Sequence, residues 1–307
     1  GLGRALLKNL GFHLTKAQAR VVSEVLNDLE KPVPMLRLVQ GDVGSGKTIV
    51  AAFAAIRAAE QGCQSALMAP TELLAEQHFL NFSSWLVPLG IGVELITGQL
   101  PAKVQRERLQ GVASGEASVV IGTHALFQEK VVFDQLALSI IDEQHRFGVH
   151  QRMALQHKAQ NSQQPHQLVM TATPIPRTLT MALYADMDVS VIDELPKGRQ
   201  PITTHTIEAA KRDQIIERVQ AVLSQGQQAY WVCTLIEDSD EIDAESANHT
   251  HEQLSQKLGR YRIGLLHGRM KSDEKVAVMN AFKAREIDLL VATTVVEVGV
   301  DVPNATY

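Results

Sequence analysis

Cysteine is scarce in this sequence. The 307 residues include two cysteines, Cys63 and Cys233, which lie far apart and form no C-x-x-C pair. Two such residues are too few for a disulfide framework, and their spacing is not that of a zinc site. We therefore expect two buried free thiols.

Long apolar runs and an excess of positive charge are absent as well. No stretch approaches the roughly 18 apolar residues that a membrane-spanning helix needs. The first residues, GLGRALLKNLGF, lack the layout of a signal peptide. The sequence therefore predicts a cytoplasmic protein with no membrane partner. Because the net charge is −5 and the isoelectric point about 6.1, contact with nucleic acid must be local rather than spread over the whole surface.

Short apolar runs alternate with helical patterns along most of the chain. Strands separated by helical segments indicate βαβ units, and therefore an α/β fold with parallel sheets. The alternation breaks at residues 193–204, where two prolines and a glycine interrupt it, and then resumes. We expect two domains, residues 1–197 and 198–307. The expected strands are residues 35–39, 65–69, 93–96, 119–121, 138–141, 167–170, 204–207, 229–233, 263–266 and 289–293. The acidic stretch 237–245 is expected to be a solvated loop.

A glycine-rich segment follows the first expected strand. Residues 41–48 read GDVGSGKT and fit the pattern G-x-x-x-x-G-K-[ST], with a helical pattern after them. In such a loop the backbone N–H groups point at nucleotide phosphates, the lysine neutralises their charge and the final hydroxyl binds Mg²⁺. An ordinary glycine-rich turn would need neither the lysine nor the threonine. The predicted phosphate-binding residues are Gly41, Gly44, Ser45, Gly46, Lys47 and Thr48.

Two acids end the apolar strand at residues 138–141. Asp142 and Glu143 are thereby placed at the carboxyl edge of a parallel sheet, where the phosphate-binding loop also opens. Asp142 is predicted to hold Mg²⁺ through water together with Thr48. Glu143 is predicted to orient or deprotonate the attacking water. With Lys47, these two acids form the predicted catalytic set.

The residues around these acids resemble a known family. Residues 142–145 (DEQH) and 170–174 (MTATP) resemble the DEAH-like box and third motif of superfamily 2 helicases. Other motifs of that superfamily are matched in order by residues 12–18, 69–74, 122–124, 267–270 and 292–301. The runs DEQHRFGVHQR, TATPIPRT and VATTVVEVGVDVPNA are most similar to the RecG family of bacterial branch-migration helicases.

Three alternatives stay open. The translocase module of the transcription-repair coupling factor shares two of the runs, although Gln144 and residues 198–204 favour the RecG family. A phosphate-loop kinase for a small molecule normally has one α/β core with a lid, whereas this chain resumes its alternation after residue 204. A nucleotide switch without turnover is the third.

The resemblance implies further nucleotide contacts. Phe12 and Gln18 match the element that reads adenine, where an aromatic face can stack and an amide can pair with donor and acceptor on the base edge. From the second domain, Gly299 and Asp301 of motif V are implied to complete the site. The implied cofactors are ATP and Mg²⁺.

The resemblance also implies coupling and DNA contacts. The implied coupling residues are His145, Thr171 and Thr173, and the implied DNA contacts are Thr71, Thr123 and Thr294. A threonine at a strand-to-helix junction can bind a DNA phosphate without reading sequence. A plain helix N-cap explains Thr71 equally well.

By resemblance, then, the chain is expected to be the motor of an ATP-dependent DNA helicase with two RecA-like domains, the second one truncated. The implied partner is duplex and branched DNA, and the implied state is a monomer. The family's wedge domain is expected before Gly1 and its motif VI arginine after Tyr307. The chain alone is therefore expected to bind ATP and to hydrolyse it barely, because such an arginine contributes about 10³ to 10⁵ in turnover.

Overall fold

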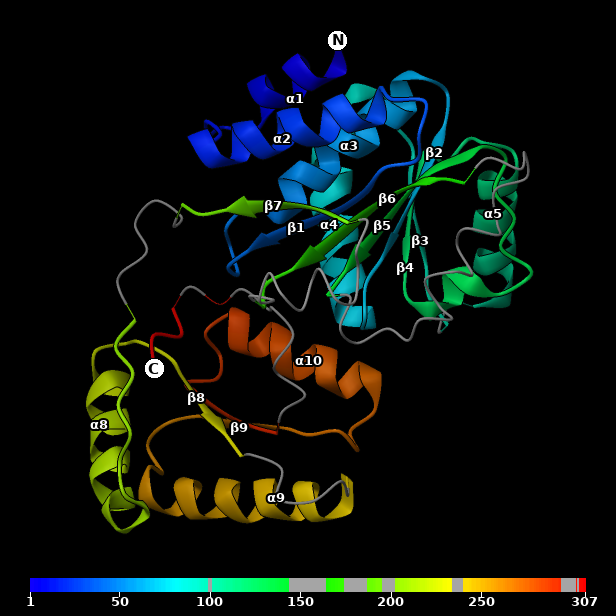
Figure 1. Cartoon of the computed structure of the whole chain (residues 1–307). Helices are drawn as coiled ribbons and strands as arrows, with labels where there is room; N and C mark the ends of the chain where they lie inside the picture. The colour runs from blue at the N-terminus through cyan, green and yellow to red at the C-terminus, as the bar shows by residue number, and fades with distance from the viewer. Residues whose placement is uncertain are drawn as a thin grey trace. The chain divides into compact units, whose positions relative to one another are not determined.

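The computed structural model describes residues 1–98, 101–143, 164–173, 187–194, 202–233, 240–293, 302 and 304–307 (Figure 1). The chain divides into two compact units, Gly1–Arg199 and Gln200–Tyr307. Within the described residues, the first unit contains a seven-stranded sheet and the second a three-stranded sheet. Every pairing between these strands is parallel, so the predicted α/β class is confirmed.

The first unit is built around the sheet order β3-β4-β2-β5-β6-β1-β7. Its strands are β1 Leu36–Gly41, β2 Gln64–Met68, β3 Val93–Ile96, β4 Val119–Gly122, β5 Leu136–Asp142, β6 His166–Thr171 and β7 Asp188–Ile192. Strands β2, β4 and β5 are buried along nearly their whole length, as apolar runs covered on both faces should be. Strand β7 lies outside every predicted strand. It is a short edge strand, exposed at three of its five residues, and it therefore lacks the continuous apolar run that predicts a buried strand.

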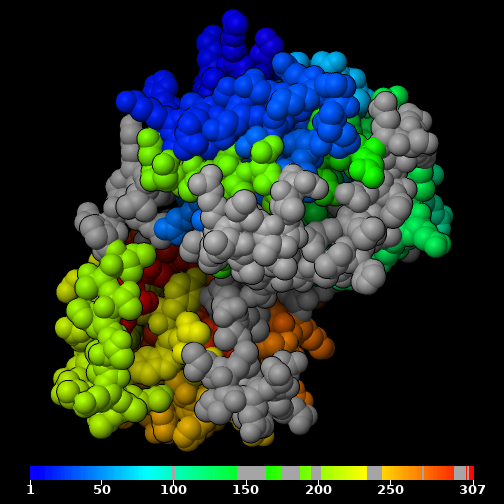
Figure 2. All heavy atoms as spheres, in the orientation of Figure 1, coloured from blue at the N-terminus to red at the C-terminus, as the bar shows by residue number. Residues whose placement is uncertain are grey.

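Helices cover both faces of this sheet. They are α1 Leu2–Asn9, α2 Lys16–Leu29, α3 Lys47–Glu60, α4 Glu72–Leu86 and α5 Ala102–Ala113, with short 3-10 turns at Val87–Leu89 and His124–Phe127. Right-handed crossovers from β1 to β2 and from β2 to β3 place α3 and α4 on one face of the sheet. The crossover from β3 to β4 runs in the opposite direction along the sheet, so it places α5 on the other face. The core beneath α5 contains Val112, Met68 and Val120. In Figure 2 the N-terminal segment, drawn in blue, lies next to the yellow-green residues of β7 and above them in the view. This agrees with the contact between α2 and β7.

A largely buried ion pair between Asp28 and Arg37 joins α2 to the sheet. Arg37 on β1 donates from Nε to Asp28 Oδ2 on α2 at 2.7 Å, and Lys31 Nζ lies 2.7 Å from Asp28 Oδ1. Burial raises the pKa of Asp28, but the hydrogen bonds from Lys31 and Arg37 outweigh it and hold the pKa below its ordinary value. The carboxylate is therefore charged and paired at neutral pH, and it holds the helix that carries Gln18 against β1.

The second unit has the sheet order β8-β10-β9. Its elements are a 3-10 turn at Ala209–Lys211, α8 Arg212–Ser224, β8 Ala229–Val232, α9 Asp240–Lys257, β9 Ile263–Leu266, α10 Ser272–Lys283 and β10 Leu289–Ala292. Ile216 and Val219 of α8 and Leu254 of α9 pack against Leu289 and Val291 of β10 to form the core of this unit.

Two predictions for the second unit are wrong. Residues 204–207 form no strand: they are exposed, and the structure assigns them no ladder partner among the described residues. The acidic stretch 237–245 is not a loop throughout, since α9 begins at Asp240. Acidic residues are favourable in the first turn of a helix, because its N-terminus carries partial positive charge.

Both cysteines are free, as predicted, but each is partly exposed rather than buried. Among the helices that the structure describes, none combines the length and apolar character that crossing a bilayer requires.

Candidate active site

The predicted nucleotide residues lie at the ends of three neighbouring strands. Strand β6 lies between β5 and β1, and the register pairs Asp142 with Met170 and Gln40 with Thr171. Because all three strands are parallel, their carboxyl ends meet at one edge of the sheet, which is where ligands bind in open α/β sheets. The phosphate-binding loop, the two acids and the threonines at the end of β6, Thr171 and Thr173, therefore share one site.

The loop from Gly41 to Lys47 has the conformation that its glycines permit. Gly44 and Gly46 have φ angles of 78° and 95°, a region that side-chain-bearing residues avoid. A Cβ on Gly46 would also overlap the side-chain nitrogen of Gln18. Helix α3 begins directly after Gly46, with Thr48 as its second residue. Its first backbone N–H groups therefore face the loop, as a phosphate site requires. The Ser45 hydroxyl is buried and has no hydrogen-bond partner among the described residues.

Lys47 folds into this loop. Its Nζ donates to the carbonyl oxygens of Gly41 at 2.6 Å and Asp42 at 3.0 Å. Burial lowers the pKa of Lys47 below its ordinary value, although the carboxylates of Asp142, Glu143 and Asp42 act in the opposite direction. The order and register of β5, β6 and β1 place the predicted lysine and the two predicted acids at the same edge of the sheet.

Asp142 has a partner that the sequence analysis did not identify. His78 of α4 lies with Nε2 2.7 Å from Asp142 Oδ2, and both residues are buried. The available signal was the spacing Leu74 to His78, which places the histidine on the buried face of α4. Finding its partner required the sheet order.

Glu143 occupies an unusual backbone conformation. Its φ of 51° lies in the left-handed region, which costs a residue other than glycine about 1 to 3 kcal/mol and is concentrated at functional sites. Its Oε1 accepts from the backbone N–H of Ala172 at 3.1 Å, and the Thr171 hydroxyl lies 3.4 Å from its Oε2. The hydroxyls of Thr171 and Thr173 lie 2.9 Å apart. One network thus joins the predicted base to the predicted coupling threonines.

Gln18 binds the loop as well as the start of its own helix. Its Nε2 donates to the Ser45 carbonyl at 2.8 Å, and its Oε1 accepts from the Thr15 backbone N–H at 3.0 Å. The Thr15 hydroxyl in turn accepts from the Gln18 backbone N–H, which completes a capping box. Each end of the amide retains capacity for one more hydrogen bond. Phe12, six positions before Gln18 in the sequence, is half exposed, with 48% of its surface accessible.

The predicted DNA contacts differ in their surroundings. Thr71 is the N-cap of α4, and its hydroxyl accepts from the Leu74 N–H at 3.3 Å. Thr123 is buried, and its hydroxyl has no hydrogen-bond partner among the described residues. His145, Thr294, Gly299 and Asp301 lie outside the described residues.

ATP and Mg²⁺ fit the residues at this edge. Lys47 presents a cation inside a glycine-rich loop that leads into the N-terminus of α3, a combination that suits phosphate oxygens. The hydroxyl of Thr48 and the carboxylate of Asp142 are oxygen donors of the kind that Mg²⁺ prefers.

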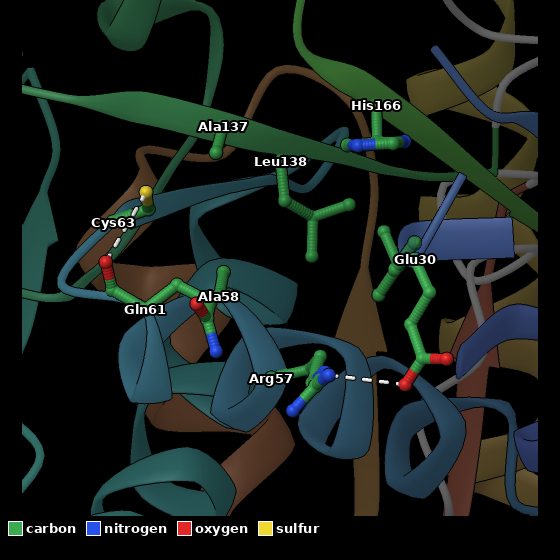
Figure 3. Close-up of a pocket in the computed structure, with 9 residues that line it drawn as sticks. Glu30, Arg57, Ala58, Gln61, Cys63, Ala137, Leu138 and His166 are labelled. Carbon is green, nitrogen blue, oxygen red and sulfur yellow. Dashed lines mark hydrogen bonds and ion pairs between the residues drawn. The ribbon is translucent and has the colours of Figure 1, made fainter. Parts of the chain in front are cut away.

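A separate pocket of about 430 Å³ opens at the opposite edge of the same sheet (Figure 3). It is lined by Leu29, Glu30, Arg57, Ala58, Gln61, Cys63, Ala137, Leu138 and His166. Arg57 and Glu30 on its rim form an ion pair with an N to O distance of 3.0 Å. His166 begins β6, at the end of that strand farthest from Thr171, so this pocket is distinct from the nucleotide site.

Two family models match the chain. Residues 15–182 match the DEAD/DEAH box helicase family, and residues 207–307 match the helicase conserved C-terminal domain. The first match alone covers more than half of the chain. It contains the phosphate-binding loop, both acids and the threonines at the end of β6.

Known relatives and a solved structure agree with these models. The chain is 59% identical over 307 residues to the ATP-dependent DNA helicase RecG of Escherichia coli K12, covering 99% of this chain and 44% of the relative. It is 49% identical over 301 residues to RecG of Bacillus subtilis 168, covering 98% and 44%. The structure of RecG bound to a three-way DNA junction matches with a TM-score of 0.80 at 40% identity, covering 99% of this chain and 39% of that one.

The predicted resemblance to superfamily 2 and RecG helicases is confirmed, as is the prediction of RecA-like parallel-sheet domains. The chain spans less than half the length of these relatives. The chain belongs to the DEAD/DEAH box helicase family.

Proposed function

We propose that this chain is the ATP-hydrolysing motor of a DNA helicase that remodels branched DNA, such as stalled forks and Holliday junctions. The observation that carries the proposal is the convergence of Lys47, Asp142 and Glu143 at one sheet edge, where β1, β6 and β5 end side by side. Support for the substrate comes from relatives named as DNA helicases and from the RecG structure bound to a three-way junction.

Each catalytic residue has a distinct part in hydrolysis. Lys47 exchanges the carbonyl oxygens of Gly41 and Asp42 for phosphate oxygens when ATP binds. Glu143 orients the attacking water and accepts its proton. Thr48, and Asp142 through water, would hold Mg²⁺, which would neutralise phosphate charge. In the same proposal Phe12 and Gln18 contact adenine, and Gly299 and Asp301 complete the nucleotide site.

The DNA-facing part of the proposal rests on other residues. Thr71, Thr123 and Thr294 contact DNA phosphates, and His145, Thr171 and Thr173 couple hydrolysis to movement. The network from Glu143 through Ala172 to Thr173 supports such coupling, because it connects the water-activating carboxylate to the segment after β6. We further propose a cytoplasmic monomer. The expectation that this chain alone binds Mg·ATP with little turnover stays a prediction.

DNA-stimulated hydrolysis tests this function. A full-length protein that contains this chain should hydrolyse ATP slowly without DNA, faster with duplex DNA and fastest with a fork, because closure on DNA completes the catalytic arrangement. The measurement is steady-state phosphate release under the three conditions. A rate that ignores DNA but rises with a small phosphate acceptor would support the kinase alternative, and nucleotide binding without any turnover would support the switch.

A further inference from the structure

A buried hydrogen bond joins α4 to the end of β5. His78 and Asp142 are separated by 64 positions in the sequence, yet Nε2 of the histidine lies 2.7 Å from Oδ2 of the aspartate. Their side chains are 8% and 11% exposed. An ionised carboxylate only accepts hydrogen bonds, so the imidazole N–H is the donor. The rest of the buried face of α4, including Leu74, Ala75 and Phe82, is apolar.

That bond fixes the carboxylate predicted to hold Mg²⁺. A hydrogen bond to Oδ2 restricts rotation of the Asp142 side chain and fixes which lone pairs remain for the water through which it would hold the ion. Hydrogen-bond partners behind metal-binding carboxylates have a measurable effect, since their loss typically weakens metal binding by about 10- to 100-fold. A merely structural histidine would instead contribute to folding and leave metal binding alone.

The position of His78 within α4 gives the bond a second consequence. Thr71, the N-cap of α4, is the proposed DNA contact at the N-terminal end of that helix. His78 follows it by about two helical turns of the same continuous helix. The same helix therefore carries a DNA contact at its N-terminus and, on its buried face, a donor to the Mg²⁺ carboxylate.

Resting on the function proposed above, we propose that His78 is a positioning residue that orients Asp142 for Mg²⁺ and thereby links the nucleotide site to the DNA-facing end of α4. The link is reciprocal, because binding at one end and binding at the other depend on the same helix position.

Two amide substitutions of different length test the orienting role. His78→Gln carries an N–H close to the position of the imidazole Nε2, whereas His78→Asn carries the same amide one methylene short of Asp142. For the 307-residue chain and both variants, the Kd of a non-hydrolysable ATP analogue is measured with Mg²⁺ and with EDTA. The gain in affinity from Mg²⁺ should be retained in His78→Gln and fall by about 10- to 100-fold in His78→Asn. Binding in EDTA should be the same in all three proteins.

The outcomes are distinguishable. If His78→Asn keeps the parental Mg²⁺ gain within about threefold, or if His78→Gln loses as much as His78→Asn, the orienting role is wrong. Unfolding midpoints are recorded for each variant, so that a change in folding is not read as a change in metal binding. Should the unsubstituted chain bind no nucleotide, the proposed function fails instead.

The link to DNA has its own readout. The Kd for duplex DNA is measured with and without the Mg²⁺-bound analogue, and the ratio of the two values reports the coupling. The ratio should differ from one in the unsubstituted chain and in His78→Gln, and approach one in His78→Asn. A ratio that is unchanged in His78→Asn overturns the link through α4.

Discussion

The substitution Glu143→Gln should lower DNA-stimulated ATP hydrolysis by about 10²- to 10⁴-fold, which is the usual contribution of a general base. The physical reason is that glutamine keeps the size of the side chain and loses the proton acceptor. Glutamine can still accept from the Ala172 N–H through its amide oxygen, and the Thr171 hydroxyl can accept from its amide nitrogen. The local structure should therefore survive. Single-turnover hydrolysis in a full-length protein with duplex DNA is the measurement.

Binding of an ATP analogue should stay within about threefold of the parental value in this variant, since Glu143 is not proposed to contact the phosphates. Glu107→Gln is the matched control, because Glu107 is an exposed glutamate on α5 of the same unit. If Glu143→Gln hydrolyses ATP at the parental rate, Glu143 serves only as a structural partner of Ala172 and Thr171.

The substitution Lys47→Ala should remove most of the affinity for ATP. Lys47 supplies the cation in a loop whose other phosphate ligands are backbone N–H groups. A hydrogen bond to a charged group contributes about 1.5 to 3 kcal/mol, so the Kd should rise by about 10- to 100-fold for each phosphate bond lost. The readout is titration of the chain with a fluorescent ATP analogue in the presence of Mg²⁺.

An exposed lysine on α5 provides the control for this measurement. Lys103→Ala removes the same charge from the same unit at an exposed position away from the loop, and should leave the Kd unchanged. An equal loss of affinity in both variants would indicate a general effect of net charge. Unchanged affinity in Lys47→Ala would place the nucleotide elsewhere.

Much of the site could be predicted because its signals are local and the sheet is parallel. The segment 41–48 specifies a tight loop before a helix, and a run of apolar residues that ends in Asp142 and Glu143 specifies a buried strand with acids at one end. In a parallel sheet the carboxyl ends share an edge, so the two signals meet without knowledge of the strand order.

The parts that were missed depend on contacts distant in sequence. The pairing of His78 with Asp142 requires α4 to pack near the end of β5, which no spacing in the sequence encodes. The left-handed backbone of Glu143 is equally invisible, because glutamate carries no preference for it.

The two differences between predicted and observed strands also depend on contacts distant in sequence. Residues 204–207 are rich in threonine and isoleucine and were predicted as a strand, whereas the structure leaves them exposed outside both sheets. In contrast, β7 forms at Asp188–Ile192 because β1 offers an open edge beside it. Whether a short β-branched run becomes a strand depends on such an edge more than on its composition.

The nucleotide site itself is tested most directly by a crystal structure of this chain with a non-hydrolysable ATP analogue and Mn²⁺, whose anomalous scattering locates the ion. We expect the ion beside the Thr48 hydroxyl and the Asp142 carboxylate, bound directly or through water. Lys47 Nζ should lie on the phosphates, and no longer within hydrogen-bond distance of the Gly41 and Asp42 carbonyl oxygens that it contacts in the present structure. An analogue bound away from residues 41–48, or an ion bound away from both Thr48 and Asp142, would contradict the account.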